Sequence, residues 1–205
     1  MNNRVVIRSL VTQEGCLVAM DDGAIVWRPS HGNRSQIKLE AIATVLLALK
    51  GPTGHYDIVA IGDSTGGVTL LSLPRLETIE KFSIDGGIVR SITAVSNSVG
   101  KYLAATQDGS VWVIGAEVPG RTLHLFTHSG PITSLRLIGE SIIIQSGWNR
   151  RTYDWTGATT NDYDGTKQYL VKAKKRANRR ARILESEQRR IKQNQPLMLD
   201  LPALS

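Results

Sequence analysis

The sequence has little cysteine and no long hydrophobic run, and both shortages narrow the class of protein. Its 205 residues include one cysteine, Cys16, which excludes a disulfide within the chain and fits a reducing compartment. The longest apolar run, AIATVLLAL, has nine residues, whereas a membrane-spanning helix needs about 20. The first 15 residues lack the basic start and apolar stretch of a signal peptide. We therefore predict a cytoplasmic protein with one domain-sized core and an appendage.

One segment of the chain has few acidic residues, and the net charge of +7 comes from this segment. From 166 to 195, eleven Lys and Arg stand against Glu185 and Glu187, so the segment carries +9. Positions 1–165 hold 14 basic and 15 acidic residues, and the last ten residues hold one acid, so each of these parts carries −1. An electrostatic partner is therefore expected to contact the single basic segment.

A repeat runs through the neutral part of the chain. Three segments align: CLVAMDDGAIVWRP, DIVAIGDSTGGVTLLSL and YLAATQDGSVWVIG. Each reads as a strand, a tight turn and a second strand, and Gly23, Gly66 and Gly109 lie 43 residues apart, twice. A tight hairpin turn needs a residue with positive φ, so we predict that these three glycines form structural turns. A fourth copy, SIIIQSGWNRRTYDW, is two residues out of phase and lacks the turn glycine at Arg150.

Further strand-like runs flank these hairpins, such as VVIRSLV before the first copy and QIKLEAI after it. Four short strands in each unit of 40–45 residues are typical of a propeller blade. We predict a mainly β fold, a small or partial β-propeller of about four four-stranded blades followed by one long helix. The expected blades cover residues 3–42, 43–86, 87–128 and 129–164.

The copies resemble the WD-repeat β-propeller family. HSGPITSLRLIGESIIIQSGWNRRTYDW follows the family's order of a His, an Ile-x-Ser-Leu strand, a second strand, a turn and an aromatic-ending strand. The resemblance covers roughly residues 3–160, without the closing Trp-Asp. It implies a small propeller, an open arc, or half of an eight-bladed ring made by a dimer. Because open sheet edges attract partners, we expect self-association or a different protein subunit along the edges.

Residues 166–195 predict a basic helix, since TKQYLVKAKKRANRRARILESEQRRIKQN has no Gly or Pro and is rich in helix formers. The helix has two possible roles. It is a solvated arm or strut, or it is a binding element whose partner is the phosphates of RNA or DNA or an acidic protein. A membrane surface is disfavoured as the partner because the apolar residues of this helix include no Trp or Phe. The candidate binding residues are Lys172, Lys174, Lys175, Arg176, Arg179, Arg180, Arg182, Arg189 and Arg190.

The final segment, PLMLDLPALS at 196–205, is a short apolar peptide. It either folds back onto the body or docks on a partner through Leu197, Leu199 and Leu201.

The stretch IGDSTGGV resembles the nucleophile motif GDSGGP of chymotrypsin-like proteases. Thr65, however, separates Ser64 from the glycine pair, and Gly66 falls in the repeat register, so we interpret the stretch as a turn. The four histidines show no metal-binding spacing beyond the isolated pair His124 and His128, for which no third ligand is evident nearby. No phosphate-binding loop is present. The strands before the turn glycines, taken as the channel lining, are apolar. We expect no cofactor or metal, and no catalysis.

The sequence thus favours a non-enzymatic protein-interaction or scaffold module, with the basic helix as its anchor in a larger assembly. A nucleic-acid-associated factor is the alternative hypothesis, and an enzyme is the third.

Overall fold

The computed structural model describes residues 4–50, 55–95, 100–115 and 121–193, with side chains described except at 165–170 and 187–193. The chain divides into two compact units, 1–163 and 164–205. The described residues form sixteen strands and one helix.

Sheet 1 contains β1 (Val6–Val11), β2 (Gly15–Met20), β3 (Ala24–Pro29) and β4 (Ser35–Lys38). Sheet 2 contains β5 (Ala43–Lys50), β6 (Tyr56–Asp63), β7 (Gly67–Ser72) and β8 (Thr78–Ser83). Sheet 3 contains β9 (Val89–Ala94), β10 (Tyr102–Thr106), β11 (Ser110–Ile114) and β12 (Thr122–Thr127). Sheet 4 contains β13 (Ser134–Ile138), β14 (Ser141–Ser146), β15 (Asn149–Tyr153) and β16 (Thr159–Asp164). In every sheet the strands pair in chain order.

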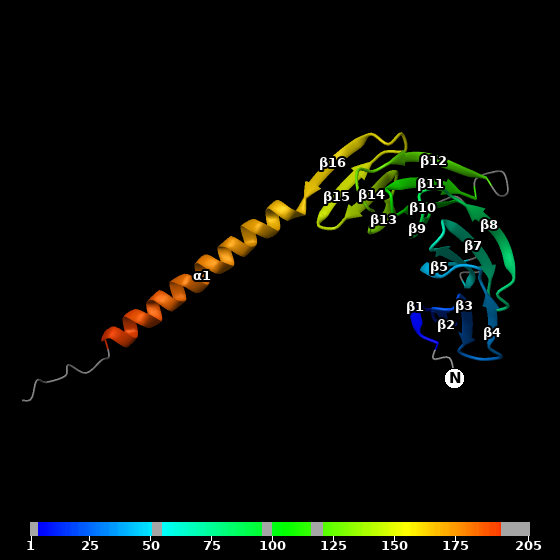
Figure 1. Ribbon diagram of the computed structural model, residues 1–205, viewed down its shortest axis with the longest axis horizontal. Helices are drawn as coiled ribbons and strands as arrows, with labels where there is room; N and C mark the ends of the chain where they lie inside the picture. The colour runs from blue at the N-terminus through cyan, green and yellow to red at the C-terminus, as the bar shows by residue number, and fades with distance from the viewer. Residues whose placement is uncertain (1–3, 51–54, 96–99, 116–120, 194–205) are drawn as a thin grey trace, which may run out of the picture. The chain divides into compact units, whose positions relative to one another are not determined.

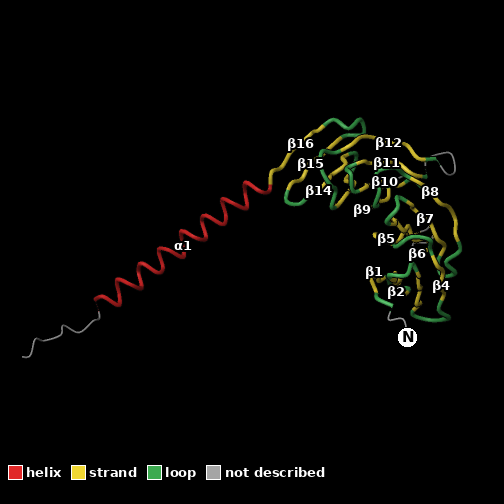
Figure 2. Tube along the Cα trace, in the orientation of Figure 1, coloured by secondary structure: helices red, strands yellow, loops and turns green. Residues whose placement is uncertain are grey.

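This architecture confirms the predicted fold class, four four-stranded sheets followed by one helix. The sheets follow one another along an arc, from sheet 1 in blue to sheet 4 in yellow (Figure 1). The first strands β1, β5, β9 and β13 lie beside one another in that order. They form the concave side of the arc, and the fourth strands form its convex side (Figure 2).

The prediction that the strands before the turn glycines face the centre is wrong, because β2, β6, β10 and β14 are the second strands of their sheets. A second strand has a hydrogen-bonded neighbour at both edges, so its backbone N–H and C=O groups are enclosed within the sheet. The all-buried strand β10, with sequence YLAAT, is an example. The side chains of these strands are apolar because they point to the sheet faces, where neighbouring sheets pack, and they do not line the centre of the arc.

Three apolar clusters hold the arc together, one at each interface between neighbouring sheets. Leu17 and Trp27 of sheet 1 pack with Ile61 of sheet 2. Phe82 of sheet 2 packs in a cluster with Tyr102 of sheet 3. The third cluster joins sheets 3 and 4 and includes Leu103, Val111, Ile142 and Ile144. Because each cluster joins consecutive sheets, stacking along the chain is the main source of burial.

The helix α1 spans Gly165–Gln193, 29 residues. Its continuity follows from the lack of Gly and Pro after its first residue. Every side chain described along it, from 171 to 186, is exposed.

Candidate interaction surfaces

The three repeat glycines occupy the turn between the second and third strands of their sheets, with φ of +82° at Gly23, +96° at Gly66 and +102° at Gly109. Each turn lies against the backbone just after the fourth strand. A Cβ at Gly23 would lie 2.7 Å from the carbonyl oxygen of that segment, and closer still at the other two glycines. Each glycine carbonyl also accepts a backbone N–H from the same segment, at 2.8–3.0 Å. The contacting residues are Leu39, Ile84 and His128.

Aspartates fasten these turns. In sheet 3, Asp108 accepts hydrogen bonds from Thr106 Oγ1 at 2.7 Å and from Ser110 N at 2.9 Å. Burial works against the charged form of Asp108, but these hydrogen bonds outweigh it and lower the pKa of the carboxyl. In sheet 2, Asp63 Oδ1 accepts the N–H groups of Thr65 and Gly67 at 2.8 and 2.9 Å. The carboxylates therefore satisfy turn backbone that the strands leave unpaired.

The protease-like stretch folds as one of these turns. His55 and Ser64 flank the two ends of β6, an eight-residue strand, and such a strand is about 26 Å long. His55 Nδ1 instead lies 3.4 Å from Glu14 Oε1, and the N–H of Ser64 donates to the carbonyl of Ile42. The two side chains are too far apart for His55 to take a proton from Ser64.

Among the described residues, no three His, Cys, Asp or Glu side chains gather in a way that could hold a metal ion. In the same part of the chain, no helix combines the length and the apolar character needed to cross a membrane. Cys16 is a free, half-buried thiol on β2.

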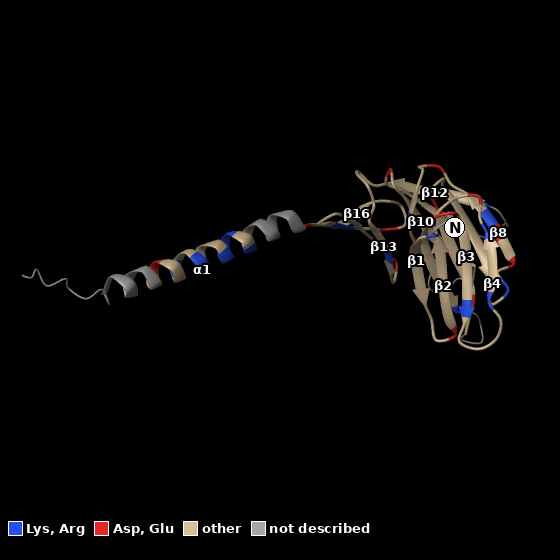
Figure 3. Ribbon diagram, turned by 60° about the horizontal axis from the view of Figure 1, so that its bottom comes forward, with Lys and Arg blue, Asp and Glu red and all other residues tan. Residues whose placement is uncertain are grey.

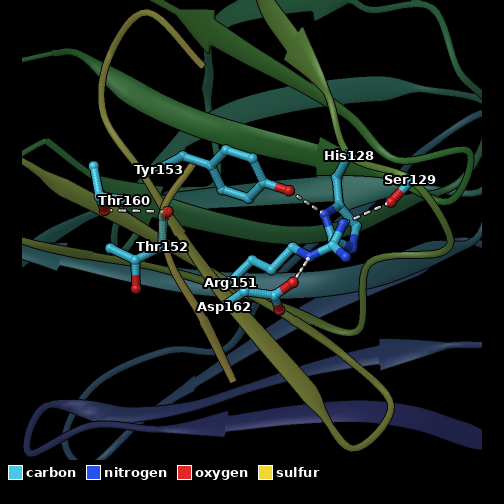
Figure 4. A network of polar contacts seen from close by, with 7 residues as sticks. All are labelled: His128, Ser129, Arg151, Thr152, Tyr153, Thr160 and Asp162. Carbon is cyan, nitrogen blue, oxygen red and sulfur yellow. Dashed lines mark hydrogen bonds and ion pairs between the residues drawn. The ribbon is translucent and has the colours of Figure 1, made fainter. Parts of the chain in front are cut away.

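A buried histidine links sheets 3 and 4. His128, only 4% exposed, follows β12, and its Nδ1 is hydrogen-bonded to the hydroxyl of Tyr153 on β15 at 2.6 Å. Below this pair, Arg151 Nε lies 3.0 Å from Asp162 Oδ2, and Arg151 Nη1 donates to Ser129 Oγ at 2.8 Å (Figure 4). Burial lowers the pKa of His128 below its ordinary value of 6.5; the charge of Arg151 lowers it further, and Asp162 opposes this.

This lowered pKa predicts a stability that falls in acid. Above pH 6.5, His128 is neutral in both the folded and the unfolded chain. As the pH falls below 6.5, the unfolded chain binds the proton first, so the free energy of unfolding decreases until the folded state is protonated too. We expect His128→Gln to flatten the pH dependence of urea unfolding below pH 6.5, and the exposed-site control His31→Gln to leave it unchanged. An equal slope in all three proteins would contradict the assignment.

On the outer face of sheet 1, turned away from sheet 2, the exposed apolar residues lie on the edge strand β1. Val18 and Val26 on the same face are buried, and Arg28 and Lys38 add positive charge. Leu17 and Ala19 point toward sheet 2, so the residues that alternate with them on β2 point outward. Register pairs Val11 with Cys16 and Val6 with Met20, which places both valines on this outer face. They are 76% and 54% exposed.

The outer face of sheet 4 is mixed. Leu135 and Ile144 face sheet 3 and are buried, so the alternating residues point outward. These include Ile138, which is 63% exposed, and two arginines, Arg136 and Arg150. No strand of the described residues covers this face or the outer face of sheet 1. Neither face can be recognised from the sequence, because the sequence pattern of a terminal repeat is the same as that of an internal one.

The predicted basic residues recur along α1, where the blue segments of the ribbon in Figure 3 mark Lys and Arg. Between 171 and 184 the helix has no acidic residue, and Glu185 is the first acid after this stretch. Like charges recur at spacings of three and four, for example Lys172 with Arg176 and Lys175 with Arg179, and such pairs destabilise an isolated helix. The exposed side chains are Lys172, Lys174, Lys175, Arg176, Arg179, Arg180 and Arg182.

Two groups of predicted site residues lie outside the part of the chain whose side chains the structure describes. Arg189 and Arg190 belong to α1, but their side chains are not described. The docking peptide with Leu197, Leu199 and Leu201 is also outside that range.

Comparison with solved structures gives the architecture its class. A chain in the crystal structure of the computationally designed Ika8 protein matches with a TM-score of 0.63 and 18% identity over 78% of this chain. A chain in the crystal structure of the Mitotic Checkpoint Complex matches with a TM-score of 0.64 and 12% identity over 81%. The fold is propeller-like.

The propeller-like arc spans about half the length of the solved chains that it matches, 49% and 55%. At these identities the likeness concerns the fold alone. No family model and no curated protein matches the sequence.

Proposed function

We propose that this chain is a non-enzymatic protein-interaction module, a WD-like propeller arc whose basic helix anchors it in a larger assembly. The observation that carries the proposal is the pair of uncovered end sheets. Inside the arc, both faces of a sheet are closed by neighbours, and Leu103 and Val59 are 0% exposed. At the end of the arc, Val11 on the outer face of sheet 1 is 76% exposed. An uncovered apolar sheet face marks a binding surface.

We assign the WD-like repeats to residues 1–165, the anchoring helix to 166–195 and a docking peptide to 196–205, and we place the protein in the cytoplasm. The fourfold repeat of a strand, a turn and a strand supports the first assignment. The dense, exposed positive charge of α1 supports the second.

The charges on the two outer faces favour a different protein as the partner over a second copy. Closing a ring with a second copy would place the outer face of sheet 4 against that of sheet 1. The first face carries Arg136 and Arg150, and the second carries Arg28 and Lys38. Like charges oppose such a contact. A partner with apolar and acidic side chains would match both faces.

Two measurements test the proposal. Affinity capture with the full chain should recover a protein partner that a variant ending at Gly165 holds less firmly. The mass of the purified protein in solution, measured with and without nuclease, should not change on nuclease treatment. A mass that falls on nuclease treatment, with no protein partner recovered, would instead assign the chain to nucleic acid.

Charge placed on the outer face of sheet 1 should block partner binding. We expect Val6→Glu combined with Val11→Glu to reduce capture of the partner at least tenfold, since a carboxylate in an apolar contact must be desolvated. The matched control is Ile79→Glu on β8, an apolar residue that is 51% exposed but belongs to an internal sheet. Exposed-site changes of this kind alter stability by about 0.5 kcal/mol or less. Equal capture by both variants would exclude this face.

A nucleic-acid-associated factor is the second candidate. The observation that favours it is the run of seven exposed cations between Lys172 and Arg182, with no acid among them. Such a helix can lie along phosphates without reading bases, so its binding would be non-specific and sensitive to salt.

A further inference from the structure

A pocket of about 390 Å³ opens at the concave side of the arc, lined by residues of sheets 1 to 3 and by the segment before sheet 4. Arg8 comes from β1, Thr44 from β5 and Arg90 from β9; Gln107 follows β10, and Thr133 precedes β13. This volume falls in the range of small-molecule sites, roughly 300–1,000 Å³. The pocket is distinct from the outer faces of the end sheets and from α1.

Irregularities in the first strands bring polar residues to this pocket. In sheet 2 the register passes from Ala43 to Val45, so Thr44 is an extra residue without a ladder partner. In sheet 3 the same happens at Arg90, between Val89 and Ser91. A bulge of this kind redirects a side chain that a regular strand would place in the alternating pattern.

Neutral oxygens hold both arginines in place. Arg8 Nε donates to the carbonyl of Thr44 at 2.9 Å, and its Nη1 donates to the carbonyl of Ile7 at 2.9 Å. Arg90 Nη2 donates to Gln107 Oε1 at 2.7 Å. Neither guanidinium forms an ion pair with a carboxylate of the described residues. Two positive charges therefore remain uncompensated at one pocket.

The charged side chains of the pocket offer a ligand only donors. A guanidinium has five N–H groups, so both arginines keep donors beyond these bonds, and Gln107 keeps its amide N–H₂. The hydroxyls of Thr44 and Thr133 donate their protons to carbonyls, those of Val89 and Gln145 among them, so these two oxygens can only accept hydrogen bonds from a ligand. A ligand that satisfies this set must be an acceptor with about two negative charges.

We propose that this pocket binds a phosphate group, held between Arg8 and Arg90. A phosphate monoester offers only acceptors near neutral pH and carries up to two charges, and arginine binds it with paired N–H groups. The volume exceeds that of a bare phosphate and leaves room for part of the alcohol that carries it. The proposal does not depend on the protein-interaction function, because it uses none of the same residues.

Calorimetry on the full chain tests the site with three probes: inorganic phosphate, O-phosphoserine and a phosphoserine peptide with its unphosphorylated counterpart. We expect saturable binding of the phosphate probes with one site per chain. Arg90→Gln should weaken that binding at least tenfold. The matched control is Arg34→Gln, because Arg34 has the same hydrogen bond to a glutamine, Gln36, at 2.7 Å but lies outside the pocket. A peptide that binds tenfold tighter than O-phosphoserine identifies a modified partner protein as the source, and equal affinity identifies a small ester.

Arg8 needs a second variant, since its bond to the Thr44 carbonyl also joins sheet 1 to sheet 2. Arg8→Gln should weaken phosphate binding at least tenfold, while Arg8→Lys, which keeps the charge, should retain more of the affinity. If Arg8→Gln unfolds, Arg90→Gln decides alone. The absence of saturable binding, or equal weakening by Arg34→Gln and Arg90→Gln, would overturn the proposal, because the phosphate would then respond only to the overall positive charge.

Discussion

Replacing Gly109 with alanine is expected to lower the free energy of unfolding by about 3 kcal/mol or more. The φ of +102° is strained for alanine, at about 1–3 kcal/mol. The new Cβ would collide with the carbonyl oxygen of His128, a backbone atom that cannot rotate away. Separation of the two segments would also weaken the His128 N–H bond to the Gly109 carbonyl, which contributes about 1 kcal/mol. In a chain of this size, a loss of 3 kcal/mol lowers the Tm by roughly 6–12 °C.

The matched control is Gly139→Ala, in the turn between β13 and β14. Gly139 also has a positive φ, +59°, but an added Cβ there would meet nothing within 4 Å. The free energy of unfolding of Gly139→Ala should therefore decrease only by the cost of the positive φ for alanine, about 1–2 kcal/mol. Urea unfolding followed by circular dichroism measures both variants. Equal losses would show that the contact with the end of β12 contributes nothing.

Neutralising four cations of α1 should remove most of its affinity for nucleic acid, if that is its partner. Each phosphate contact contributes about 0.9 to the slope of log K against log salt for duplex DNA. The fourfold variant should therefore flatten this slope by up to about 4 and weaken binding at low salt by several orders of magnitude. Glutamine is the replacement of choice because its helix propensity is close to that of Lys and Arg. The substitutions are Lys174→Gln, Arg176→Gln, Arg179→Gln and Arg182→Gln.

A control with the same change in net charge separates the helix from the overall charge of the protein. It removes four exposed cations of the first unit, Arg34, Lys38, Arg121 and Arg136. Fluorescence anisotropy with a labelled duplex and a single-stranded RNA, across a salt series, compares the two variants. If both lose the same affinity, or if neither does, α1 is not the nucleic-acid contact.

The hairpins could be predicted from the sequence because each turn is formed by residues that are close together along the chain. Spacing of 43 residues located Gly23, Gly66 and Gly109, and the structure places each at positive φ between the second and third strands. The helix was predictable for a similar reason, since helix propensity and the lack of Gly and Pro act over neighbouring residues. Its predicted range, 166–195, differs from α1 by two residues or fewer at each end.

The centre of the arc was not predictable in this way. The side chain of Arg90 points to the pocket because of a bulge, and a bulge depends on the register between β9 and β10, which no periodicity records. The strand β16 is also hard to recognise from its sequence. Its sequence TTNDYD is polar, but pairs such as Arg151 with Asp162 and Arg150 over the Tyr163 ring attach it to β15. Cross-strand polar pairs of this kind replace hydrophobic alternation.

Each sheet of the arc is built from one continuous stretch of chain, and no strand is borrowed from a distant segment. A unit of this kind can be duplicated or deleted as a single block, because neither change would require another sheet to be rethreaded. In sheets 1 to 3, the steric fit between the turn glycine and the end of its own fourth strand lies within the block, so it would be copied intact. The length of such an array is therefore an evolutionary variable that can change in steps of one repeat, with the curvature set by the contacts between consecutive blocks.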